Sequence, residues 1–269
     1  MKKSILDKKN IKIKIIKIYF FIKDLILEES KIMTEVIYKS IILLLRKIYK
    51  FFFQIFFNSL TRENLFNIIY KRNFWNIGKN EQFYSGIGSR DERIIKPYTK
   101  KIKNLIKKKN YKILDLGTGD FNVSKKFYKY AKFFYAVDIV KPLIDRNKKK
   151  FKGKNLKFSH LDICKDKLPN ANVYILRQVL QHLSNREIKL ILNKLNKKNK
   201  IIIITEHSPS KKFIPNLDIK RCIVTRTAIN SGVVIDRHPF NFKYKKKKKL
   251  LEVVSYPDLE KIITYQYNT

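Results

Sequence analysis

Residues 111–122 of the chain read Tyr-Lys-Ile-Leu-Asp-Leu-Gly-Thr-Gly-Asp-Phe-Asn, a short apolar run followed by two glycines. The run has the composition of a buried strand, and we expect a helical stretch from the glycines to about Lys132. A strand, a glycine turn and a helix in this order form the nucleotide-binding start of a doubly wound sheet. The chain holds only seven glycines, so the pair Gly117 and Gly119 indicates a backbone that passes close to a ligand.

Further apolar segments follow this start at regular intervals. They cover residues 133–140, 156–163, 172–179 and 200–205, with basic helical segments between them. Their first residues lie 16 to 28 residues apart, a spacing typical of βαβ units, which predicts a parallel sheet. Residues 250–255 and 261–267 are expected to add an antiparallel hairpin. The predicted class is therefore α/β, with a doubly wound, mostly parallel sheet of seven strands.

The glycine turn differs from a dinucleotide-binding fingerprint at two positions. The position that requires a third small residue holds Asn122, and Asp120 directly follows the second glycine. A carboxylate beside a pyrophosphate would be repelled by it. The turn therefore favours a ligand that lacks phosphate.

Three motifs, in order along the chain, resemble those of class I S-adenosylmethionine-dependent methyltransferases. They are residues 113–119 (ILDLGTG), residues 136–139 (AVDI) and residues 161–163 (LDI). Residues 172–184 are similar to the fourth-strand segment of a bacterial subgroup of small-molecule or glycan-cluster methyltransferases, although Asn172 and Gln178 stand where that subgroup commonly has aspartate. The resemblance extends from about Leu65 to the C-terminus. It implies a Rossmann-like methyltransferase fold and S-adenosyl-L-methionine as the cofactor.

The same resemblance implies a set of cofactor-binding residues. The glycines let the backbone pass under the methionine part of the cofactor, and Asp115 orients the turn and the cofactor amine. Asp138, which lies 19 residues after Gly119, accepts hydrogen bonds from the ribose hydroxyls. Asp162 accepts from the adenine amine, and a strand-end cap is the alternative for each aspartate. The implied set is Asp115, Gly117, Gly119, Asp138, Ile139, Asp162, Ile163 and Gln178, with the two isoleucines beside the adenine ring.

Methyl transfer from a sulfonium is an in-line displacement, so the protein mainly holds the acceptor atom about 3 to 3.5 Å from the methyl carbon. A hydroxyl acceptor also requires a general base. His182, Glu206 and His207 are the candidates, because each follows the carboxyl end of a strand, where ligands of open α/β sheets bind. Packing against the sheet is the alternative for both histidines. The four histidines and two cysteines are widely dispersed, so we expect no metal site.

Two further segments carry functional hypotheses. Residues 85–89 (Ser-Gly-Ile-Gly-Ser) are expected to form either a nest of N–H groups that faces an anionic group or an ordinary surface turn. Residues 242–249 contain six lysines, and a run of like charges is typical of a solvated loop.

The chain is expected to consist of a basic amphipathic helical extension over residues 1–62 and a methyltransferase domain over residues 63–269. On a helix over residues 34–60 the cations fall within a sector of about 120° and the other positions are almost wholly apolar. This segment lacks the roughly 18 consecutive apolar residues of a spanning helix. It either lies on a membrane surface, with its cations at lipid phosphates, or packs on its own domain or a subunit.

The net charge of +39 would attract nucleic acid or an anionic membrane. The excess is spread over the whole chain, together with the Ile, Asn, Phe and Tyr that A/T-rich codons supply. We therefore expect a cytoplasmic enzyme, peripheral on the inner membrane face if residues 1–60 bind lipid, that methylates a hydroxyl or amine of a small molecule or saccharide. RNA methylation is the second hypothesis, opposed by the lack of a recognisable RNA-binding module. A non-catalytic, membrane-attached protein that retains the fold is the third.

Overall fold

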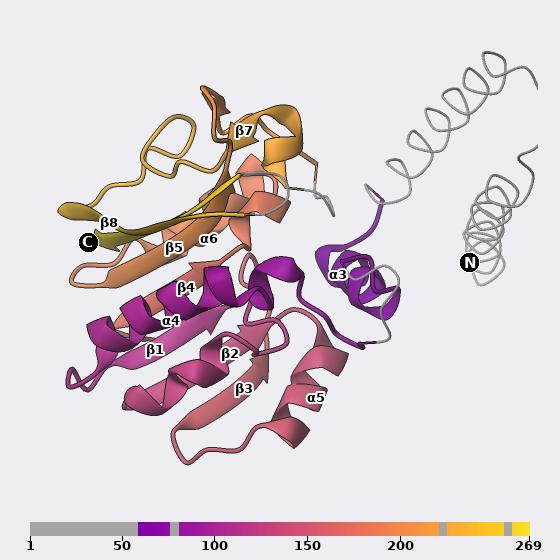
Figure 1. Cartoon of the computed structure of the whole chain (residues 1–269), viewed down its shortest axis with the longest axis vertical. Coiled ribbons are helices and arrows are strands. Elements are labelled where there is room, and N and C mark those ends of the chain that lie inside the picture. Colours follow the sequence, from indigo (N-terminus) through magenta and orange to yellow (C-terminus); the bar gives the residue numbers. More distant parts are fainter. Residues whose placement is uncertain (1–58, 76–80, 221–224, 256–259) are drawn as a thin grey trace, which may run out of the picture. The chain divides into compact units, whose positions relative to one another are not determined.

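The computed structural model describes residues 59–75, 81–220, 225–255 and 260–269 (Figure 1). These residues belong to a compact unit that begins at Leu60, apart from Ser59. The expected extension lies almost wholly outside the described residues, so both hypotheses about it stay predictions. Within the described ranges, no helix is long and apolar enough to cross a bilayer.

Seven strands form one sheet with the order β3-β2-β1-β4-β5-β9-β8. Strands β1 to β5 pair in parallel, and β9 runs antiparallel to both β5 and β8. The predicted doubly wound α/β sheet with an antiparallel hairpin is therefore confirmed. The strands are β1 (Lys112–Leu116), β2 (Phe133–Asp138), β3 (Leu156–His160), β4 (Val173–Arg177), β5 (Ile201–Ser208), β8 (Lys246–Val254) and β9 (Lys261–Asn268).

Helices cover both faces of the sheet, and for this reason the central strands are apolar on both sides. The helix α4 (Glu92–Ile106) packs its buried residues on one face of β1, β4 and β5. The helix α6 (Asn185–Leu195) packs on the other face of the same strands (Figure 1). The remaining elements are α3 (Arg62–Lys71), α5 (Lys141–Lys150), the short strands β6 (Ile214–Pro215) and β7 (Ser231–Gly232), and the 3₁₀ turns η1 (Ile87–Ser89), η2 (Ser124–Lys126), η3 (Tyr128–Tyr130), η4 (Leu180–His182) and η5 (Arg226–Ile229).

The prediction of a helix after the glycine turn is wrong. This stretch contains only the two short turns η2 and η3. Phe121 has a positive φ of 63°, and the Asp120 carboxylate accepts the backbone N–H of Asn122 at 3.0 Å. The Ser124 hydroxyl donates to Asp115 at 2.7 Å. Local side-chain hydrogen bonds of this kind compete with helix formation, and they hold the segment against the end of β1.

The solvated loop expected over residues 242–249 is wrong for its second half, where Lys246–Lys249 begin the edge strand β8. Lysine suits an edge strand, because its charge keeps the unpaired edge from pairing with another chain. The stem of such a lysine can still pack on apolar surface. Lys247 shows this arrangement, with its Nζ 4.4 Å from the ring centroid of Tyr265.

Candidate active site

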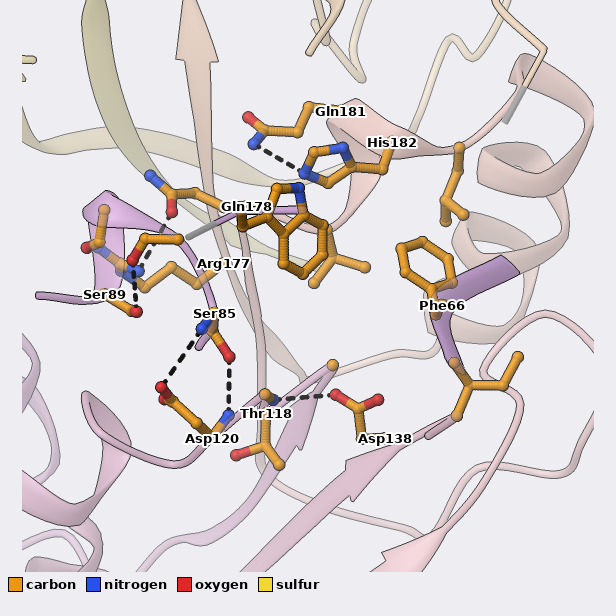
Figure 2. A pocket seen from close by; sticks show the side chains of 18 of the residues that line it. Phe66, Ser85, Ser89, Thr118, Asp120, Asp138, Arg177, Gln178, Gln181 and His182 are labelled. Atoms are coloured by element: carbon orange, nitrogen blue, oxygen red, sulfur yellow. Dashed lines mark hydrogen bonds between the residues drawn. The ribbon is translucent and has the colours of Figure 1, made fainter. Parts of the chain in front are cut away.

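The carboxyl edge of the parallel strands opens into a cavity of about 520 Å³. This volume is within the range of small-molecule sites. The glycine turn, the ends of β2 and β4, and the 85–89 segment line the cavity together with one stripe of α3 (Figure 2). The cavity therefore lies at the sheet edge where the sequence predicts a ligand.

The glycine turn approaches its neighbours too closely to carry side chains. Gly117 and Gly119 have φ values of 75° and 60°. A Cβ at Gly117 would lie 2.6 Å from Val179, and a Cβ at Gly119 would lie 2.6 Å from the Ser85 hydroxyl. The Asp115 carboxylate stabilises the turn by accepting a hydrogen bond from the Thr118 hydroxyl at 2.6 Å. The turn thus lines the cavity without side chains at its two glycines.

We expect Gly119→Ala to destabilise the wild-type protein more than it destabilises a Ser85→Gly protein. The positive φ of 60° at Gly119 costs an alanine about 1 to 2 kcal/mol in both backgrounds. In the wild type a Cβ at Gly119 also lies 2.6 Å from the Ser85 hydroxyl, and the second background lacks this contact. Denaturant unfolding of the four proteins isolates the contact, and equal losses of free energy of unfolding in the two backgrounds would show that Ser85 moves away without cost.

Asp138 ends β2 with its carboxylate at the cavity. Its Oδ2 accepts the N–H of Gly119 at 2.9 Å, and its Oδ1 accepts the N–H of Val140 at 3.0 Å. Burial raises the pKa of Asp138 to about 6, against the lowering effect of these hydrogen bonds. Each oxygen keeps a lone pair, so the carboxylate can accept two further donors, such as the hydroxyls of a ribose.

Asp162 follows β3 and is held by a residue that the sequence reasoning missed. Arg62, the first residue of α3, donates from Nη2 to Asp162 at 2.7 Å and from Nη1 to Glu187 at 2.7 Å. The backbone N–H of Cys164 donates to the other Asp162 oxygen at 2.9 Å. Arg62 Nε also donates to Asp162, at 3.2 Å. A carboxylate has about four lone-pair sites, so these three donors orient Asp162 and leave room for one more. Ile139 and Ile163 line the same end of the cavity.

Gln178, His207 and Glu260 form a hydrogen-bonded chain at the other end of the cavity. The Gln178 amide nitrogen lies 3.0 Å from His207 Nε2, and the Glu260 carboxylate lies 2.9 Å from His207 Nδ1. An amide nitrogen only donates and a carboxylate only accepts, so the proton of the ring is on Nδ1. The Gln178 oxygen faces a guanidinium N–H of Arg177 at 3.5 Å, which supports this orientation of the amide.

Glu260 is ionised in this arrangement. Although its burial opposes ionisation, hydrogen bonds from His207 and Thr227 lower the pKa of Glu260. A carboxylate on Nδ1 orients an imidazole and stabilises the imidazolium that forms when Nε2 takes a proton. His207 therefore has the partners of a general base.

His182 lies in η4, buried beside the aromatic side chains of the cavity. Its ring centroid is 5.4 Å from that of Trp75, and its Nε2 lies 3.3 Å from the amide nitrogen of Gln181 (Figure 2). The structure thus gives this ring a packing partner, and a catalytic role of His182 stays a prediction.

Glu206 points into the protein. Its carboxylate accepts the backbone N–H groups of Val179, Leu180 and Gln181 at 2.9 to 3.2 Å, and burial raises its pKa to about 7. The residues that line the described cavity do not include Glu206. These contacts favour a role in holding the loop after β4, and the catalytic role expected of Glu206 stays a prediction.

Neither Arg62 nor Glu260 carries a signal in the sequence. Arg62 lies upstream of the first motif, among 61 lysines and arginines. Glu260 precedes β9, and it reaches His207 because β9 pairs with β5 in antiparallel register. Both residues become recognisable only through partners that are far away in the chain.

Residues 85–89 form a turn, one of the two conformations expected for them. Residues 87–89 make the turn η1, in which the Ser89 N–H donates to Gly86 O at 3.0 Å. The carbonyl of Gly88 accepts from Arg177 at 2.6 Å. A Cβ at Gly88 would lie 2.4 Å from the Gln178 side chain, so this glycine makes room for Gln178.

Comparisons with known proteins show the family and the fold of the chain. A family model described as "Methyltransferase domain" matches residues 107–252, more than half of the chain. No curated protein matches the chain in sequence. The structure is similar to that of the N-methyltransferase NodS from Bradyrhizobium japonicum WM9 in complex with S-adenosyl-L-homocysteine, with a TM-score of 0.52, 8% identity, and coverage of 74% of this chain and 97% of that chain.

Human N-acetylserotonin methyltransferase, solved in complex with SAM, is a second similar structure. Its TM-score is 0.47 and its identity 15%, with coverage of 78% of this chain and 61% of that chain. The likeness to NodS shows the fold, and the family model covers β1 to β5 with their connections and most of β8. The chain belongs to the methyltransferase domain family, as its three motifs predict.

Proposed function

We propose that the protein transfers the methyl group of S-adenosyl-L-methionine to a hydroxyl group of a small molecule or saccharide. The observation that carries this proposal is the single cavity that joins the carboxylates of Asp138 and Asp162 to the pair formed by His207 and Glu260. The cofactor supplies a methyl group on a positively charged sulfur. NodS, the structural relative with the same fold, was crystallised with S-adenosyl-L-homocysteine, the product of such a transfer.

The residues present fit this cofactor. Asp138 has two oxygens available to ribose hydroxyls, and Asp162 has one available to the adenine amine, next to Ile163. Gly117 and Gly119 line the cavity with backbone alone, and a Cβ at either position would lie 2.6 Å from Val179 or Ser85. The aspartates, glycines and isoleucines of the predicted set all line the same cavity, and so does Gln178.

The general base in the proposal is His207. Its Nε2 accepts the proton of the acceptor hydroxyl, and Glu260 stabilises the resulting imidazolium through Nδ1. The hydroxyl takes the place of the Gln178 amide, which occupies Nε2 in the structure. Gln178 therefore acts at the acceptor end of the cavity in this proposal, instead of at the cofactor, as the resemblance implies.

The lining of the acceptor end suits a hydroxylated molecule. Amide groups of Gln178 and Gln181 and hydroxyls of Thr225 and Thr227 line it, and such groups both donate and accept hydrogen bonds. Trp75 adds an aromatic face, on which an apolar ring face can pack. A cytoplasmic position, with or without a membrane surface for residues 1–60, stays a prediction.

The proposal is tested in two steps with the full-length protein. Calorimetry with S-adenosyl-L-homocysteine should show binding to one site per chain. Mass spectrometry should then detect methylation in a panel of hydroxylated small molecules and monosaccharides, with amines and RNA as comparison acceptors. A folded protein that binds no nucleoside would contradict the cofactor assignment, and methylation confined to amines or to RNA would contradict the hydroxyl acceptor.

A further inference from the structure

Arg177 lines the cavity, and the proposed reaction does not use it. It ends β4, where Leu176 pairs with Leu116 of β1, so Arg177 is the neighbour of the glycine turn. Its guanidinium lies 5.0 Å from the ring centroid of Tyr98 and donates to the carbonyl of Gly88 at 2.6 Å. Figure 2 shows it beside the segment that carries Ser85 and Ser89.

Arg177 forms no ion pair with any carboxylate of the described residues. Its Nε is buried without a hydrogen-bond partner among the same residues. Arg62, which also lines the cavity, has both Asp162 and Glu187. Two aspartates of the cavity have other partners: Asp115 Oδ2 accepts from two hydroxyls, and Asp120 pairs with Arg90 at 2.6 Å. A guanidinium keeps its proton in proteins. Arg177 therefore gives the cavity wall a positive charge that no described carboxylate pairs with.

The order of the strands gives this charge a place along the ligand. Asp162 follows β3, Asp138 ends β2, the glycine turn follows β1 and Arg177 ends β4, and these strands are neighbours in that order. Adenine, ribose and amino acid follow one another in the same order in S-adenosylmethionine. A cofactor with its adenine at Asp162 and its ribose at Asp138 therefore extends its amino-acid part toward Arg177.

We propose that Arg177 binds the carboxylate of the cofactor's amino-acid part, an inference that rests on the proposed function. A planar guanidinium matches a carboxylate with two parallel N–H donors. Asp115 lies two residues before Gly117 and on the α4 face of the sheet, as Arg177 does. The two side chains thus present a negative and a positive charge to the ammonium and the carboxylate of one amino acid.

The inference is tested with two ligands that differ only in the amino-acid part. S-adenosyl-L-homocysteine has it, and 5′-methylthioadenosine retains only the nucleoside and the thioether. Arg177→Gln should weaken the first ligand roughly 10- to 100-fold and leave the affinity for the second unchanged. Arg62→Gln, at the adenine end, should weaken both ligands by the same factor. Arg186→Gln, which removes an exposed charge outside the cavity, should change neither.

Calorimetry on the full-length protein separates the role of Arg177 from the assignment of the cofactor site. Equal effects of Arg177→Gln on both ligands, or no effect on either, would overturn the role of Arg177 while the cofactor site stands. A wild-type protein that binds neither ligand would overturn the proposed function as well.

If Arg177→Gln does not fold, the inference is tested on the wild-type protein by changing the ligand. Wild-type protein should bind decarboxylated S-adenosylmethionine roughly 10- to 100-fold more weakly than S-adenosylmethionine. Arg177→Lys, which keeps the charge without the planar fork, should lie between wild type and Arg177→Gln. Equal affinity for the two ligands would overturn the inference.

Discussion

His207→Ala is expected to lower kcat for a hydroxyl acceptor by about 10² to 10⁴, the range that a general base contributes, and to leave the affinity for S-adenosyl-L-homocysteine unchanged. The reason is that His207 Nε2 can accept the proton while the Glu260 carboxylate, 2.9 Å from Nδ1, stabilises the imidazolium. Single-turnover kinetics with the acceptor found in the methylation panel measures this effect. Glu260→Gln should lower kcat less, because the imidazole remains but its charged form loses the carboxylate.

The matched control is His182→Ala. This change removes the ring that packs at 5.4 Å from Trp75, so we expect a lower temperature of unfolding and a smaller loss of kcat. A full loss of turnover in His182→Ala, with His207→Ala still active, would assign the base to His182 instead.

The tautomer of His207 is measurable without any acceptor. Nitrogen NMR of the wild-type protein should show His207 protonated on Nδ1, because Glu260 accepts at that atom and Gln178 donates to Nε2. In Glu260→Gln the amide offers either a donor or an acceptor, so the preference should weaken. A wild-type ring protonated on Nε2 would contradict the hydrogen-bond assignment.

Asp138→Ala should weaken the binding of S-adenosyl-L-homocysteine by roughly 100-fold or more. Two hydroxyl donors to a charged acceptor contribute about 1.5 to 3 kcal/mol each, and both are lost. The variant also frees the N–H groups of Gly119 and Val140, which Asp138 now binds, so thermal unfolding must accompany the calorimetry. Unchanged affinity in the folded variant would remove the ribose assignment.

The affinity of the wild-type protein should also depend on pH through Asp138. Its pKa is about 6 because of burial, and ribose hydroxyls bind the ionised form better, so binding lowers this pKa and releases a proton. Affinity should therefore rise between about pH 5 and pH 7 and level off above, with a slope of at most tenfold per pH unit. Asp138→Asn should flatten this part of the profile. A wild-type affinity that falls over the same range would contradict the assignment.

The strands and the glycine turn were predictable because their signals are local. The apolar runs ending in Leu116 and Asp138 and the glycines that follow the first run are contiguous in the chain, and burial of both sheet faces requires continuous apolar strands. The two short 3₁₀ turns that stand after Gly119, in place of the predicted helix, were not predictable. The contacts of Asp120 and Ser124 with the end of β1 and its neighbours outweigh the local preference there.

The sequence by itself determined that Asp115, Asp138 and Asp162 lie along one edge of the sheet, since each stands at or just after the carboxyl end of an apolar strand. Only the tertiary structure decided which partners these and the catalytic candidates have. Arg62 reaches Asp162 across 100 residues, and Glu260 reaches His207 across 53. The physical reason is that hydrogen-bond partners across a fold depend on register and packing, which leave no periodic trace in the chain. At the Asp162 end of the cavity the charges are paired through Arg62. Arg177, at the end of β4, keeps its charge for a ligand.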